Sequence, residues 1–161
     1  MNIEELYKEL EGLVNKKIRY MNITCNMLCI GIGEPRELEA DDKIIDTFEY
    51  RIHVQCFWRI INNTSKEVKM SLQMAYENIE PSDKANDELN PQFEYEDIEK
   101  DIVIDSFCLH SNYDLSLYFS NGDVLEVIKN AIYYEDWRLI HVDNKRNSKH
   151  IVIENENVTE E

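Results

Sequence analysis

The stretch Ile52-His53-Val54-Gln55-Cys56-Phe57-Trp58-Arg59-Ile60 carries the clearest pattern in this chain of 161 residues. Successive side chains of a β-strand point to opposite faces, so one face of the stretch carries Ile52, Val54, Cys56, Trp58 and Ile60. The other face carries His53, Gln55, Phe57 and Arg59. The alternation predicts one long strand whose first face lies in the core.

Trp58 and Trp137 are the only tryptophans, and each is followed by an arginine and a branched aliphatic residue. Large aromatic side chains dominate protein cores, so we expect both tryptophans to be structural residues with hydrogen-bonded indole N–H groups. The arginines that follow them, Arg59 and Arg138, should point to the opposite faces of their strands. The repeated triplet suggests one structural unit that is used twice.

The remaining sequence predicts further strands after one helix. Asn2 and Glu5 have the spacing of a capping box, and apolar residues then recur at helical spacing over about 13 residues. Apolar runs or alternation predict strands at 18–23, 27–32, 68–74, 102–109, 114–120, 124–127, 137–142 and 151–153. The range 34–49 reads as a polar connection.

Asn121-Gly122 predicts a hairpin. We expect a three-residue loop with Gly122 in the left-handed conformation and Leu117 opposite Val127.

The predicted fold class is α+β, antiparallel and strand-rich with an N-terminal helix. We predict a single domain over 1–161, with similar halves at 1–76 and 93–154 joined by an acidic connection at 77–92.

The net charge of −16 excludes nucleic acid as a direct partner, because that affinity comes largely from lysine and arginine. Half of this net charge lies between residues 77 and 101, where ten acidic residues and two lysines give −8. This region is either a solvated connection or a surface that attracts a basic protein. The candidate partner-binding residues are Asp83, Asp87, Glu88, Glu94, Glu96 and Asp97.

No basic leader precedes an apolar run at the start of the sequence, and no apolar run approaches the roughly 20 residues of a membrane helix. We therefore expect a cytoplasmic protein that does not bind membranes. The four cysteines lie in or beside apolar segments, and we expect them to be free thiols.

The sequence contains no motif that would assign a catalytic residue, a metal or a cofactor. Gly31-Ile32-Gly33 lacks the third glycine of a dinucleotide fingerprint, and no Cys-x-x-Cys pair indicates zinc. His53 shares a strand face with Gln55 and Arg59, and these three residues could line a polar groove.

Several short motifs resemble those of a family of small, mostly bacterial proteins of unassigned function. They include Cys56-Phe57-Trp58-Arg59-Ile60, Asn121-Gly122 and Glu135-x-Trp137-Arg138. Phe57 stands where that family usually has proline, and a Gly-x-x-Asp segment expected after the first Trp-Arg is absent. Some such small acidic proteins look like immunity proteins of bacterial toxin systems. The resemblance implies a partner-binding role and supplies no catalytic residue.

Three hypotheses of function follow. The first is a non-enzymatic binding protein, immunity-like, whose acidic surface neutralises a basic toxin. The second is a small-ligand-binding or enzymatic domain with a groove near His53, Gln55 and Arg59. The third is a structural homo-oligomer.

Overall fold

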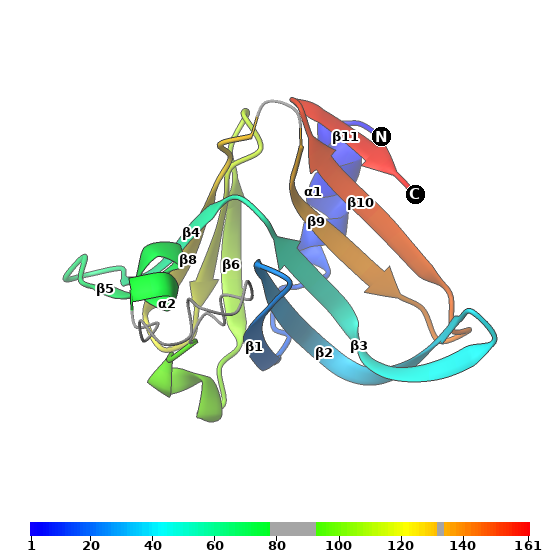
Figure 1. Ribbon diagram of the computed structural model, residues 1–161, viewed down its shortest axis with the longest axis horizontal. Coiled ribbons are helices and arrows are strands. Elements are labelled where there is room, and N and C mark those ends of the chain that lie inside the picture. Colours follow the sequence, from blue (N-terminus) through cyan, green and yellow to red (C-terminus); the bar gives the residue numbers. More distant parts are fainter. Residues whose placement is uncertain (78–92, 132–133) are drawn as a thin grey trace, which may run out of the picture.

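The computed structural model describes residues 1–77, 93–131 and 134–161, which form two antiparallel β-sheets (Figure 1). The larger sheet contains, in spatial order, β1 (Ile18–Thr24), β2 (Met27–Ala40), β3 (Lys43–Val54), β9 (Glu135–Val142), β10 (Ser148–Glu154) and β11 (Asn157–Glu160). The smaller sheet contains β5 (Val68–Ser71), β4 (Phe57–Asn62), β8 (Asp123–Ile128), β7 (Leu115–Phe119) and β6 (Ile104–Leu109). The inner faces of the two sheets contribute to one hydrophobic cluster.

Helix α1 (Ile3–Glu11) begins with the capping box formed by Asn2 and Glu5, and its side chains contact both sheets. Its buried Leu6 and Leu10 join the core. Tyr7 packs against Phe107 of β6, with ring centroids 4.8 Å apart. The other helical segments are α2 (Leu72–Glu77) and the 3-10 turn η2 (Glu96–Glu99). The sequence correctly predicts an antiparallel, strand-rich fold with an N-terminal helix, but the balance is mostly β rather than α+β.

The stretch 52–60 has the predicted alternation but is not one strand. Ile52, Cys56, Trp58 and Ile60 are all at most 2% exposed. The chain nevertheless leaves β3 at Val54 and enters β4 at position 57, in the facing sheet. The long-strand prediction is wrong because a chain that passes between two facing sheets can keep the same face toward the core on both sides of the passage.

Asp136 holds both passages of the described chain from one sheet to the other. Its backbone carbonyl accepts the N–H groups of Gln55 and Cys56 at 2.8 and 3.1 Å, at the turn from β3 to β4. Its side-chain Oδ1 accepts the N–H groups of Asn130 and Ala131, both at 3.0 Å, on the way from β8 to β9. Asp136 is completely buried, so water cannot replace these bonds.

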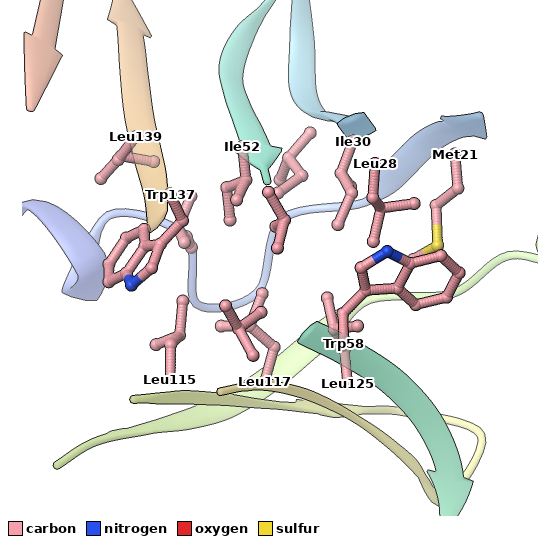
Figure 2. Packing of buried hydrophobic residues seen from close by; sticks show 14 of the residues in the cluster. Met21, Leu28, Ile30, Ile52, Trp58, Leu115, Leu117, Leu125, Trp137 and Leu139 are labelled. Carbon is pink, nitrogen blue, oxygen red and sulfur yellow. The ribbon is translucent and has the colours of Figure 1, made fainter. Parts of the chain in front are cut away.

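Both tryptophans lie between the sheets, Trp58 on β4 and Trp137 on β9 (Figure 2). The indole N–H of Trp137 donates to the backbone carbonyl of Tyr113 at 2.9 Å. Trp58 packs against Phe93, with ring centroids 6.0 Å apart. Each tryptophan directly follows a passage between the sheets, which is the common structural context of the two triplets.

The two sheets have corresponding strand orders. The larger reads β1-β2-β3-β9-β10, and the smaller, taken from its other end, reads β6-β7-β8-β4-β5. Trp137 pairs with Val54 of β3, just as Trp58 pairs with Val127 of β8. Each sheet thus combines strands from both ranges, so neither the range 1–76 nor the range 93–154 contains a complete sheet.

Two connections differ from their predictions. The range 34–49 is not a polar loop, because β2 and β3 continue through it as a paired ribbon that ends in the turn Asp41-Asp42. The predicted three-residue loop is confirmed, because residues 120–122 connect β7 to β8 with Gly122 in the left-handed conformation at φ 88°, but its predicted register is wrong, since Leu117 faces Leu125 instead of Val127. A register difference of two residues leaves the same faces buried, which explains why the apolar pattern could not exclude it.

Candidate binding surfaces

The acidic residues named from the sequence are only partly described by the structure. Asp83, Asp87 and Glu88 lie outside the described residues. Glu94 is exposed to solvent, and Glu96 begins η2. The remaining candidate, Asp97, is engaged within the protein.

Asp97 belongs to a polar network that anchors η2 on the β7–β8 hairpin. Lys69 contacts Asp97 at 3.1 Å and the buried Asp123 at 2.9 Å. The hydroxyl of Tyr95 donates to the same Asp123 carboxylate at 2.5 Å. Hydrogen bonds from Lys100 and Lys69 hold the pKa of Asp97 below its usual range. Burial, followed by the bond to Asp123, raises the pKa of Tyr95. These contacts give Asp97 an internal role.

The structure does not bring His53, Gln55 and Arg59 together. His53 lies on the outer face of β3, whereas Arg59 lies on the outer face of β4 in the other sheet. Arg59 pairs with Glu126 of β8 at 2.5 Å. Gln55 is exposed at the passage between the two strands.

His53 instead has basic neighbours on the larger sheet. Its direct partner across β3 and β9 is Arg138, while Arg51 and His150 lie on either side of Ile140. Burial, followed by the charges of Arg51 and Arg138, lowers the pKa of His53 to about 4. Arg51 lies two residues before His53 and therefore shares its strand face, so strand alternation in the sequence could have predicted that Arg51 is a neighbour of His53. His150 could not be found in this way, because its place depends on pairing between strands.

An acidic ribbon, which we define as residues 34–48, is the part of the β2–β3 hairpin that pairs with neither β1 nor β9. Strand β1 pairs with β2 only up to Ile32, and β9 pairs with β3 only from Tyr50 onward. In the ribbon the two strands pair with each other, and the β9–β10 loop lies beside them, where the Glu39 N–H donates to the Arg146 carbonyl at 3.2 Å (Figure 1). Its exposed acids are Glu34, Glu37, Glu39, Asp41, Asp42 and Asp46.

The ribbon also exposes apolar side chains. Ile44 and Ile45 are 55% and 47% exposed, and Leu38 stands directly opposite Ile45. Six acids against Arg36 and Lys43 give the ribbon a net charge of −4. Arg146, in the β9–β10 loop, supports one side of the ribbon through an ion pair with Glu37 at 2.6 Å.

Comparison of the chain with models of known protein families, with proteins of established function and with solved structures gave no match. In the described part of the chain, no helix is long and apolar enough to cross a membrane. Residues 1–77, 93–131 and 134–161 also contain no group of three histidine, cysteine or acidic side chains placed to hold a metal ion.

Proposed function

We propose that this protein is a non-enzymatic binding protein whose acidic ribbon docks on a basic partner protein. The observation that carries the proposal is the exposed Ile45, with Leu38 directly opposite it on the same face, on a ribbon of net charge −4. Protein interfaces combine an apolar centre that supplies binding energy with a charged rim that supplies specificity. The ribbon offers both within 15 residues, 34–48.

Charge supports a basic partner rather than a neutral one. The net charge of −16 accelerates the encounter with a positively charged protein and repels acidic competitors. Such steering weakens as salt shortens the screening length to about 8 Å at physiological ionic strength. The resemblance to immunity proteins supplies the class of partner that we propose, a basic bacterial toxin. The acidic residues of 77–101 would enlarge the same negative field.

Two triple variants with equal charge change test this function. Glu39→Gln, Asp42→Asn and Asp46→Asn neutralise the ribbon, whereas Glu11→Gln, Glu154→Gln and Glu156→Gln neutralise exposed positions elsewhere. Both variants have a net charge of −13, which is −16 plus three.

Immobilised wild-type protein is exposed to a native cell lysate at low and at high salt. We expect it to retain a basic protein at low salt only, the ribbon variant to lose that protein, and the control variant to keep it. Equal loss in both variants would show that net charge alone attracts the protein, and no capture at either salt would refute the proposal.

We further propose that the ranges 1–76 and 93–154 are similar halves of a duplicated unit. The corresponding strand orders and the equivalent pairs Val54–Trp137 and Val127–Trp58 support this proposal. In such an arrangement each half donates strands to the sheet of the other, β4 and β5 in one direction and β9 and β10 in the other.

A further inference from the structure

The outer face of the larger sheet carries a basic cluster, which we define as Arg51, His53, Arg138 and His150. These residues come from the adjacent strands β3, β9 and β10 (Figure 1). Their neighbours in sequence, Ile52, Leu139 and Ile151, point to the other face and fill the core. The cluster therefore lies on the face opposite the one that packs against α1 and the smaller sheet in the common core.

The two arginines of the cluster differ in their pairing. The Nε and Nη2 groups of Arg138 donate to the two carboxylate oxygens of Glu135 at 2.7 and 2.5 Å. Its Nη1 group lies 3.0 Å from Nδ1 of His150, and Glu161 is 3.7 Å away. Arg51 has no ion-pair partner in the described part of the chain, and its buried Nε–H lacks a hydrogen-bond acceptor there. The positive charge of Arg51 thus has no carboxylate partner among the described residues.

An unpartnered buried donor is costly, because folding has removed its water without a replacement. Arg51 carries five N–H donors in a planar fork that matches the oxygens of a carboxylate or phosphate. A bound oxyanion would accept from the terminal N–H groups of Arg51 and neutralise its charge.

The histidines add donors to the same face. Arginine can only donate, so Nδ1 of His150 accepts from Arg138 and the neutral ring carries its proton on Nε2. Burial and the charges of Arg138 and Arg51 lower the pKa of His150. His53 is neutral at pH 7 for the same reasons, so each ring presents one N–H group without adding charge.

The other groups that face the cluster do not neutralise Arg51. Burial is the main cause that raises the pKa of Tyr20 and of Cys29, so the phenol and the thiol stay protonated at pH 7. The ring of Tyr20 covers Gly31, the direct β2 partner of Arg51, where an added Cβ would come within 2.1 Å of the ring. The acids Glu135 and Glu161 contact Arg138.

We propose that Arg51, with the N–H groups of His53 and His150, binds the phosphate or carboxylate group of a small molecule on the outer face of the larger sheet. The site is separate from the acidic ribbon and does not depend on the proposed docking function. The overall negative charge does not prevent binding, because distant acids are screened within about 8 Å at physiological ionic strength while the guanidinium contacts its ligand directly.

Nuclear magnetic resonance tests the site with inorganic phosphate and acetate as probes, at pH 7 and constant ionic strength maintained with sodium chloride. We expect at least one of the two anions to shift the ring signals of His53 and His150 saturably. The probe that binds more tightly identifies phosphate or carboxylate as the preferred group. Bound anion should also raise the pKa of both rings, since negative charge favours the protonated imidazole.

Arg51→Gln should weaken binding by about tenfold or more, the typical loss for a charge-assisted hydrogen bond. Arg59→Gln, an arginine on the outer face of the other sheet, is the matched control and should leave the affinity unchanged. If Arg51→Gln does not fold, Arg51→Lys keeps the charge without the fork and should weaken binding severalfold. Shifts that chloride reproduces, or equal losses in the Arg51 and Arg59 variants, would overturn the proposal.

Discussion

Replacing Asp136 by alanine should destabilise the protein more than any change at an exposed acid. The substitution removes the Oδ1 acceptor of two backbone N–H groups, those of Asn130 and Ala131. Hydrogen bonds to a charged group contribute about 1.5 to 3 kcal/mol each, so the expected loss is about 3 to 6 kcal/mol. This is a large part of the roughly 5 to 15 kcal/mol by which domains are typically stable.

Urea denaturation followed by far-ultraviolet circular dichroism measures this loss. Asp136→Asn keeps an acceptor in place and removes the charge, so its loss should be smaller than that of Asp136→Ala. Asp105→Ala, at an exposed position of β6, is the control and should change the free energy of unfolding by less than about 0.5 kcal/mol. A loss below about 1 kcal/mol for Asp136→Ala would show that the passage from β8 to β9 is held by other contacts.

Four further predictions concern the fold. Trp58→Ala should cost about 3 to 5 kcal/mol in the same urea assay, whereas Tyr134→Ala, 75% exposed, should cost little. Gly122→Ala should cost about 1 kcal/mol, since its φ is 88° although its Cβ would meet open space, and Gly122→Asn should cost less. The folded-state pKa of His53 is lowered to about 4, so His53 takes up a proton more readily in the unfolded chain. The contribution of neutral His53 to stability is therefore complete above pH 6.5 and is lost as the pH falls toward 4. Between pH 7 and 4.5 the wild type should lose more stability than His53→Gln. Fragments 1–90 and 91–161 should be unfolded alone by circular dichroism and regain strand structure on mixing, because each sheet needs strands from both; independent folding of either would contradict the interlocked topology.

The sequence predicts local features of this fold well. The capping box at Asn2 and Glu5 is present, and the alternation in 52–60 identifies the buried face. It does not reveal the passage at Gln55, because the period of two continues across it. The ribbon was missed for the opposite reason: neither of its faces is fully buried, so strands 34–40 and 43–48 show no apolar alternation.

The binding surfaces were less accessible to sequence reasoning. Strand alternation places Arg51 beside His53, but only the pairing of β3 with β9 and of β9 with β10 adds Arg138 and His150. Such pairing joins residues almost 100 positions apart, and no local pattern encodes it. The groove predicted near Arg59 required that residues 52–60 form a single strand. The passage between the sheets instead places His53 and Arg59 in different sheets.

Backbone amide hydrogen exchange of the complex with the basic protein captured at low salt locates the docking surface. We predict slower exchange in residues 34–48 on binding, strongest around Ile44 and Ile45, with the protection lost at high salt. Protection confined to other parts of the chain, with unchanged exchange in the ribbon, would contradict this prediction.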